Sequence, residues 1–486
     1  MLARLLRGLI RSYLLLPKGF SGMLEQPGST FPRELSAAEN RFTFFSERSR
    51  SLTGSTDLTL FGRVFRAFRY RDFRLMWIGA CTSTIGTFVQ QFAQSWLVFS
   101  LTNDPFYLGL DLFLGQLPIV MFSLLGGVFA DRIDRRKLLL MSQYIQMSCA
   151  FLLALLVASG TVKIRYILTL SFIVGLGQAF GGPAYSALLP TLVGAEDLTN
   201  AVAMNSIQFN LARIIGPTIG GFAYAVFGRT WCFVLNGVSF IAVIISLYMI
   251  QVKFVPPKSS VSILSSMKEG IRFIRHREGM RPLVVLAFCT TLLAFPLSAF
   301  LPVFVKNVFA RGPETLAFLM VCSGAGSVCG GLIVAGLGRL KHQGRAALLI
   351  LTVMGTIITA FALSRWLPLS AVLLFAGGAA IMASASLMIT LVQLIVTDDM
   401  RGRVMSVYNL AFRGGMPMGS LVLGRLMPRF GVSLTIACAG SLLVLLSLYF
   451  LLVQRRVATL QTPVTTGETL TTAEAAKEAS ARKVIS

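Results

Sequence analysis

The stretch Gly126-Gly127-Val128-Phe129-Ala130-Asp131-Arg132-Ile133-Asp134-Arg135-Arg136-Lys137 joins two apolar segments and is the most informative part of the chain. Gly126 and Ala130 are four residues apart, so on a helix they form a small-residue face against which another helix can pack closely. Asp131 follows at the edge of the apolar segment, where a carboxylate can cap the N-terminus of a neighbouring helix. Four basic residues come next, a pattern typical of a cytoplasmic membrane-protein loop. A solvated basic loop with no further role explains the same charges.

Apolar segments of about 20 or more residues recur on both sides of this loop, from about residue 74 to residue 453. The 486 residues are 55% apolar and 13% charged, with a mean hydropathy of +0.74, whereas about 25% charge is usual in soluble domains. Each segment can cross a hydrocarbon core about 30 Å thick. We therefore expect an all-α polytopic membrane protein and exclude a soluble enzyme, a disordered chain and a disulfide scaffold. The twelve predicted spans are 74–100, 106–130, 138–159, 165–190, 199–227, 230–251, 282–306, 313–337, 346–364, 367–396, 402–427 and 432–453.

Lys and Arg are distributed unevenly between the loops. If both tails are cytoplasmic, the five inner loops hold 16 of them and the six outer loops about eight. This bias predicts a multi-pass protein of the plasma membrane (the inner membrane in a bacterium) with both termini cytoplasmic, and it explains the net charge of +24 without nucleic acid. The predicted parts are a basic cytoplasmic tail at 1–73, a six-helix bundle at 74–251, a basic cytoplasmic linker at 252–281, a second bundle at 282–453 and a disordered cytoplasmic tail at 454–486. Within the linker, 261–276 is expected to form an amphipathic surface helix.

Residue types that carry enzyme chemistry are scarce in this sequence. All seven cysteines lie in apolar segments, and the two histidines, His276 and His342, lie in separate basic loops. The sequence contains no P-loop, no metal-ligand pattern and no nucleophile constellation. We therefore expect no metal, no cofactor and no enzymatic activity.

The two predicted bundles share a weak internal repeat. Around spans five and eleven, Ser206, Arg213 and Pro217 recur 200 residues later as Ser406, Arg413 and Pro417. Each copy follows a short loop that contains two adjacent acids. Six spans plus six, with a long middle connection, is typical of a transporter built from two repeats.

The quoted loop resembles the signature loop of the major facilitator superfamily. The matching residues are Gly127, Asp131, Arg132, Arg135 and Arg136, while Asp134 stands where that pattern usually has glycine. The resemblance implies a gating latch, in which this loop contacts span eleven and favours one side of the transport cycle.

Span five resembles the antiporter motif of the same superfamily. The motif residues are Arg213, Gly216, Pro217, Gly220 and Gly221, and two glycines of the fuller pattern are alanines here. Ala212, Gly216 and Gly220 form one smooth face, which we expect to pack against Gly326 and Gly330 of span eight, although ordinary helix packing explains such a face equally well. With residues 401–406, span five is similar to the enterobactin-exporter and macrolide-efflux branch of drug:proton antiporters. That resemblance implies export.

Polar and charged residues inside the spans supply candidates for the substrate cavity and for ion coupling. The cavity candidates are Thr87, Gln90, Gln91, Gln94, Gln178, Asn205 and Arg413. Hydrogen bonds between helices are the alternative role for the amides. Arg213 and Arg413 could recognise an anion, balance a proton carrier or tie down backbone carbonyls. Asp111, the intramembrane carboxylate, is the proton-carrier candidate, with a water-exposed position at the outer mouth as the alternative.

These features lead to one main hypothesis and two alternatives. We expect a monomeric secondary exporter in the lipid bilayer that moves small, bulky, lipophilic molecules (drug, macrolide or siderophore-like), driven by an ion gradient, with the proton as the expected coupling ion. An importer of a sugar or other metabolite is the first alternative, but it should lack the glycine–proline signature of span five. A non-transporting receptor or scaffold is the second alternative, and it would need no latch.

Overall fold

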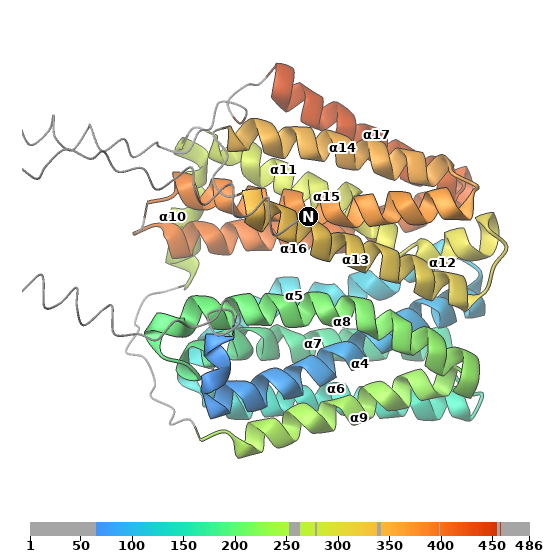
Figure 1. The fold of residues 1–486 in the computed structure, drawn as a ribbon, viewed down its shortest axis with the longest axis horizontal. Coiled ribbons are helices and arrows are strands. Elements are labelled where there is room, and N and C mark those ends of the chain that lie inside the picture. The colour runs from blue at the N-terminus through green and yellow to red at the C-terminus, as the bar shows by residue number, and fades with distance from the viewer. Residues whose placement is uncertain are drawn as a thin grey trace, which may run out of the picture. The chain divides into compact units, whose positions relative to one another are not determined.

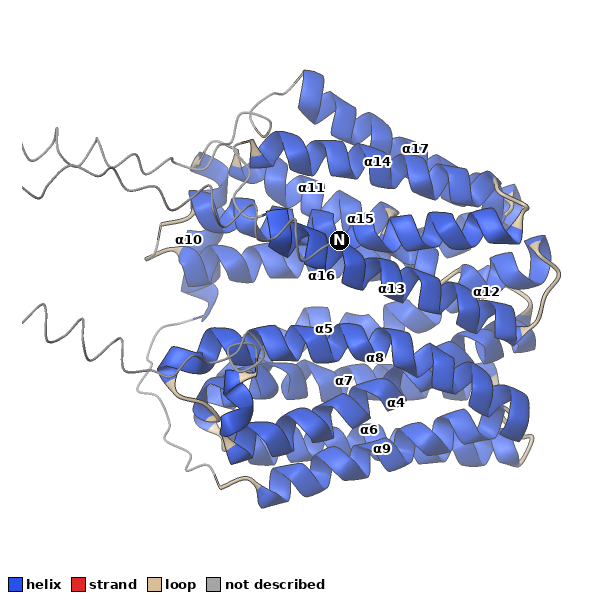
Figure 2. Ribbon diagram, viewed as in Figure 1, coloured by secondary structure: helices blue, strands red, loops and turns tan. Residues whose placement is uncertain are grey.

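The structure of the protein is a computed structural model that describes residues 65–251, 263–277, 279–337, 342–397, 399–453 and 457. Nearly all of these residues are helical, and they form no strand (Figure 2). This arrangement confirms the expected all-α class. The predicted tail at 454–486, apart from Val457, and the predicted tail at 1–73 up to residue 64 lie outside the described residues.

Long helices occupy the positions of the predicted spans. The first half contains η2 (Arg66–Arg69), α4 (Arg71–Thr102), α5 (Pro105–Arg132), α6 (Arg135–Ala158), α7 (Ile164–Leu188), η3 (Leu189–Thr191), η4 (Ala195–Asp197), α8 (Leu198–Phe227) and α9 (Arg229–Met249). The second contains α10 (Ile263–His276), α11 (Met280–Leu293), η5 (Phe295–Ser298), α12 (Leu301–Val303), η6 (Phe304–Val308), α13 (Pro313–Leu337), α14 (Gln343–Leu363), α15 (Leu367–Ile395), α16 (Arg401–Phe430) and α17 (Val432–Leu452).

Within the described residues, nine helices are long and apolar enough to cross a membrane by length and composition. The long helices α4, α8 and α16 are not among these nine. They carry the amide stripe, the first intramembrane arginine and its repeat, respectively. Polar and charged residues inside a span are expected to face the interior of the bundle or a cavity rather than lipid. The three helices therefore hold most of the candidate residues for function.

The seventh predicted span is the one whose helix is interrupted. Helix α11 ends at Leu293, and η5, α12 and the π-helical turn η6 follow it up to Val308. Pro296 and Pro302 lie in the interrupted part. Proline has no N–H to donate and its ring clashes with the preceding turn, so two prolines six residues apart prevent a continuous α-helix.

The helices pack as two related groups, α4–α9 and α11–α17 (Figure 1). In the first group α5 packs against α7, α4 against α8, and α6 against α9; the matching pairs in the second group are α13 with α15, α11 with α16, and α14 with α17. Gly228 and Gly431 have φ values of 86° and 80° and are the N-cap residues of α9 and α17. This positive φ favours glycine at both matching turns. The repeat seen in the sequence therefore extends to the packing.

The predicted surface helix is also present, as α10. It packs against the start of α16, where Glu269 forms an ion pair with Arg403 and Ile274 is buried. Lys268, Arg272 and Arg275 are exposed. Ile274 thus faces the protein and the basic positions face away from it, as expected of an amphipathic helix.

Candidate functional site

The amide stripe of α4 joins a hydrogen-bonded chain through the first group of helices. Asn236 Nδ2 of α9 donates to Gln90 Oε1 at 2.7 Å, and Gln90 Nε2 donates to Gln94 Oε1 at 3.1 Å. Gln94 Nε2 in turn donates to Asp111 Oδ2 of α5 at 2.8 Å and to Ser171 Oγ of α7 at 2.9 Å. Each of these amides therefore ties one helix to the next.

Asp111 is the acidic end of this chain. The Ser171 hydroxyl donates to Asp111 Oδ1 at 2.5 Å, so both carboxylate oxygens accept a hydrogen bond. The side chain is half-buried, and Ser171 beside it is 9% exposed. A carboxylate held by neutral donors inside a helical bundle can gain or lose a proton without breaking an ion pair. Asp111 is therefore held between helices, and its role as a proton carrier stays a prediction.

The other predicted cavity residues divide into two kinds. Gln178 Nε2 donates to Gln146 Oε1 at 3.2 Å, and Asn205 Oδ1 accepts from the Tyr185 hydroxyl at 2.6 Å. These contacts are the interhelical hydrogen bonds that the sequence left open as an alternative. Thr87 donates to the carbonyl of Ser83 on its own helix at 2.9 Å. Gln91 and Arg413 are instead exposed.

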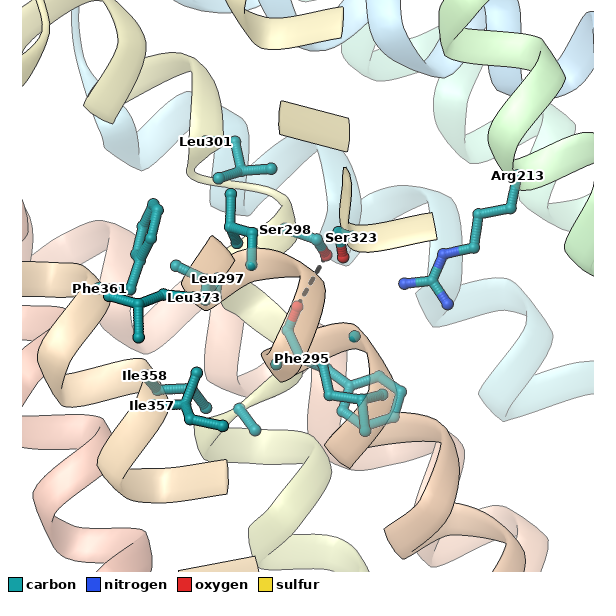
Figure 3. A pocket seen from close by; sticks show the side chains of 15 residues that line it. Arg213, Phe295, Leu297, Ser298, Leu301, Ser323, Ile357, Ile358, Phe361 and Leu373 are labelled. Atoms are coloured by element: carbon teal, nitrogen blue, oxygen red, sulfur yellow. Dashed lines mark hydrogen bonds between the residues drawn. The ribbon is translucent and has the colours of Figure 1, made fainter. Parts of the chain in front are cut away.

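A pocket lies against the second group of helices. Its walls come from Ala294, which follows α11, and from η5, α12, α13, α14 and α15, and one basic side chain from α8 completes it (Figure 3). The lining residues are Arg213, Ala294, Phe295, Leu297, Ser298, Leu301, Ser323, Ile357, Ile358, Phe361, Leu373, Leu374, Gly377, Gly378 and Ile381. Figure 3 shows the Arg213 side chain extending from α8 toward this largely apolar wall. The sequence singled out Arg213 but not the pocket, because its walls are ordinary apolar residues.

The small-residue face of span five packs differently from the prediction. A Cβ added at Gly220 would lie 2.9 Å from the Phe92 ring of α4, and one at Gly216 would meet Phe88 of the same helix. Gly326 and Gly330 pack against α15, at Phe375 and Ala379. The predicted pairing of these two faces was therefore wrong, because residue spacing defines a face but not the helix that packs against it.

Helices α8 and α13 nevertheless touch at a different set of residues. A Cβ added at Gly324 would lie 3.0 Å from the Arg213 carbonyl oxygen, which is the carbonyl that Pro217 leaves without an i+4 donor. A Cβ at Gly221 would lie 2.6 Å from Ala317 Cβ. Gly221 and Gly324 thus allow the two helix backbones to approach closely.

Contacts between the two groups of helices gather toward one end, the end that the charge bias predicts to be outer. Lys306 Nζ donates to Asn103 Oδ1 at 3.1 Å and lies 5.3 Å from the centre of the Phe99 ring. Gly109 of α5 packs against Ser420 of α16, and Arg425 lies 5.9 Å from the centre of the Phe106 ring. The sequence did not identify this cluster, because its cations look like ordinary loop charges.

The signature loop lies at the opposite end. An added Cβ at Gly127 would meet no described atom within 4 Å, and Arg132 is exposed. Arg136 donates to the carbonyls of Tyr248 and Ile250, at 2.9 and 3.2 Å, within the first group of helices. Arg135 likewise donates to the Ala187 carbonyl at 2.8 Å. Arg135 and Arg136 therefore contact their own half in this conformation, and the Asp131 side chain lies outside the described part of the structure.

The departure from the signature pattern at residue 134 has a local explanation. Asp134 is the N-cap of α6, and its Oδ1 accepts from the Arg136 backbone N–H at 2.9 Å. Aspartate is among the preferred N-cap residues, because its carboxylate satisfies a free backbone donor at the helix start. The residue that fits the pattern least well is thus the one that begins the third span.

A cluster just before α4 was not assigned any function from the sequence. Arg66 and Arg69 form ion pairs with Asp197 at 3.2 and 2.8 Å, and the Asp197 side chain is only 1% exposed. Arg69 also pairs with Glu196 at 2.9 Å. Hydrogen bonds from the Glu196 backbone N–H and from the Tyr70 hydroxyl hold the pKa of the Glu196 carboxyl below its ordinary value. The adjacent acids were visible in the sequence, but their partners lie in the segment predicted as a tail.

Comparison with known proteins identifies membrane transporters among the relatives of this chain. The sequence profile of the family described as "Transmembrane secretion effector" matches residues 63–475. Macrolide efflux protein A of Streptococcus pyogenes is 22% identical over 394 residues, which cover 78% of this chain and 96% of that protein. The multidrug efflux pump Tap of Mycolicibacterium fortuitum is 26% identical over 375 residues (74% and 90%). The enterobactin exporter EntS of Shigella boydii is 26% identical over 333 residues (67% and 78%).

Solved structures match the fold. A bacterial homologue of the human lysosomal transporter Spinster, in an inward-facing and occupied conformation, has a TM-score of 0.61 at 14% identity, covering 80% of this chain and 97% of that one. A POT family transporter in complex with 5-aminolevulinic acid has a TM-score of 0.64 at 12% identity, with the same coverage. At these sequence identities, the match shows that the arrangement of the helices is shared and shows nothing about function.

Proposed function

This chain belongs to the transmembrane secretion effector family of the major facilitator superfamily, and from that premise we propose that it is a secondary active exporter of small, bulky, partly apolar molecules. Family and relatives make it a transporter and not an enzyme. In the proposal it works as a monomer in the plasma membrane, with both termini cytoplasmic. The halves 74–251 and 282–453 rock against each other to expose one site to each side in turn.

The observation that carries the proposal is the uneven contact between the halves. Residues near one end pack across the interface, among them Gly109 with Ser420 and Gly221 with Ala317. The opposite end, which holds the signature loop, is called the basic-loop end. There, Gly127 and Gly402 have no described neighbour within 4 Å of an added Cβ. Rocking that exchanges a closed end for an open one is the motion that alternating access requires. The positive-inside bias would make the open end cytoplasmic, where an exporter loads its cargo.

We further propose that export is coupled to proton movement. Asp111 would be the carrier, because its two oxygens are held by Gln94 and Ser171 rather than by a basic residue. An intramembrane carboxylate is costly to keep charged, so its protonation can be coupled to a change between two conformations. The amide chain from Asn236 to Gln94 would keep Asp111 in place while it changes charge.

The test is transport into everted membrane vesicles that contain the protein, with an acid-inside pH gradient. The substrates are ethidium, Hoechst 33342, erythromycin and a catechol siderophore, and vesicles without the protein are the control. We expect accumulation of at least one compound, abolished by a protonophore. Uptake only into right-side-out vesicles would instead support the importer, and no movement of any compound would support the receptor or scaffold.

A further inference from the structure

Arg213 occupies an unusual position for a cation. It is the sixteenth of the 30 residues of α8, so it lies near the middle of a long helix. Its side chain extends toward the pocket of the other half, whose lining includes Phe295 and Leu297 (Figure 3). A cation at this depth requires an anionic partner, backbone carbonyls or water.

Within the described part of the chain, the Arg213 guanidinium forms no ion pair with a carboxylate and no hydrogen bond to a backbone carbonyl. No carboxylate lines the pocket, whose only polar side chains besides Arg213 are Ser298 and Ser323. Ser298 donates to the Phe295 carbonyl at 2.9 Å, so its hydroxyl proton is engaged locally. Asp111 is held by Gln94 and Ser171, so the role of counter-charge to that carboxylate is not supported.

The composition of the pocket indicates what could pair with this cation. Phe295, Leu301, Ile358, Phe361 and Leu373 offer an apolar wall that would bind an aromatic or aliphatic body. The guanidinium at one edge offers a fork of donors that matches a carboxylate or sulfonate. A cationic ligand would meet like charge and no acid in this pocket.

We propose that the cargo is an amphiphilic organic anion, with its acidic group on Arg213 and its apolar body in the pocket of the second half. This inference rests on the proposed export function and narrows its substrate class. Because Arg213 belongs to one half and the pocket wall to the other, such a ligand would bridge the two halves during loading.

The proposal is tested with two dyes that share one scaffold. 8-Anilino-1-naphthalenesulfonate carries a sulfonate, and N-phenyl-1-naphthylamine is its neutral counterpart. Binding is measured by fluorescence to the full chain in nanodiscs, with empty nanodiscs subtracted. We expect the anionic dye to bind about tenfold more tightly, the effect of one hydrogen bond to a charged group. Equal affinities, or no binding of the anionic dye, would overturn the proposal.

Variants separate the charge from the pocket. Arg213→Gln should weaken the anionic dye about tenfold and leave the neutral dye unchanged, while Arg213→Lys should retain part of the preference. Arg165→Gln removes the same charge from an exposed position on α7 and is the matched control. Gly377→Leu should weaken both dyes, because an added Cβ there meets only Ile357 at 3.4 Å and the longer side chain fills the pocket. An unchanged preference in a folded Arg213→Gln protein would contradict the assignment.

Transport of the same dyes keeps the two proposals distinguishable. If everted vesicles accumulate the neutral dye and not the anionic one, the result supports the export function and contradicts the anion site. The anionic dye could instead bind in an Arg213-dependent way while neither dye nor any compound of the everted-vesicle test is transported. That result would support the anion site and contradict the export function.

Discussion

At the scale of single residues, Asp111 and Arg213 both lie within long helices, and they do not form an ion pair with each other. The carboxylate is held by an amide and a hydroxyl, and the guanidinium faces an apolar pocket. One group can therefore change its charge without disturbing the other. This separation suits a mechanism in which the proton and the cargo occupy different sites in one protein.

Asp111→Asn should weaken pH-driven transport at least tenfold while leaving exchange of substrate across the membrane largely intact. The amide keeps the shape of the carboxylate but cannot carry a proton, and exchange needs no net proton movement. Glu314→Gln removes an exposed acid near the start of α13 and is the control. The measurement compares proton-driven uptake with counterflow in proteoliposomes. Equal loss of both activities, or loss of neither, would exclude Asp111 as the carrier.

Two tyrosines test whether their hydroxyl groups have hydrogen-bond partners in the folded protein. Tyr408 is fully buried, and its hydroxyl has no hydrogen-bond partner among the described residues, whereas Tyr185 donates to Asn205 at 2.6 Å. Tyr408→Phe should therefore leave the thermal midpoint in detergent unchanged or raise it. Tyr185→Phe should lower the free energy of unfolding by about 1 kcal/mol. A clear loss of stability in Tyr408→Phe would mean that its hydroxyl is satisfied in the folded protein.

At the scale of helices, the sequence predicted positions better than partners. The apolar segments located the long helices to within a few residues, because length and hydropathy are local properties. The spacing of Gly216 and Gly220 predicted a close-packed face but not that α4 would cover it. Likewise, Glu196 and Asp197 were visible as a pair, but Arg69 is more than 120 residues away and only the fold brings it to them. The pocket was invisible because apolar residues that line a cavity look the same as those that fill a core.

Glycine substitutions on two helices should separate packing from movement. Gly220→Leu places a side chain against Phe92 within one half and should cost about 1–3 kcal/mol of stability. Gly127→Leu meets no described atom within 4 Å and should fold normally, yet lose transport when the basic-loop ends come together. Thermal melting and vesicle uptake are measured on both. Full transport by Gly127→Leu would argue against a closed latch at that residue.

At the scale of the whole molecule, the two halves resemble each other in packing but differ in chemistry. The Gly228 and Gly431 turns and the α4–α8 and α11–α16 pairs are matching features. The described first half holds Asp111 and its amide chain, and the second half supplies most of the apolar pocket. Rocking of the halves would therefore change the distance between a proton site in one half and a cargo surface in the other.

This arrangement predicts a specific crosslinking pattern in a protein whose seven native cysteines have been replaced. Gly221→Cys with Ala317→Cys joins the halves at the predicted outer end, where an added Cβ at 221 lies 2.6 Å from Ala317 Cβ. A disulfide needs about 3.5–4.5 Å between these atoms, so a small separation of α8 and α13 suffices. Mild oxidation of the resting protein should form this crosslink readily and stop transport, and reduction should restore transport.

The matching pair at the other end is Gly127→Cys with Gly402→Cys, two positions without a described neighbour within 4 Å of an added Cβ. Under the same oxidation, the resting protein should form this crosslink slowly. The yield should rise when substrate and a pH gradient drive the cycle, because rocking brings the basic-loop ends together as the outer ends part. The single-cysteine variants show how far each substitution alone, without a crosslink, changes transport. If the inner pair forms first in the resting protein and the outer pair forms only during turnover, the resting state is the opposite one and the proposed loading side must be reversed.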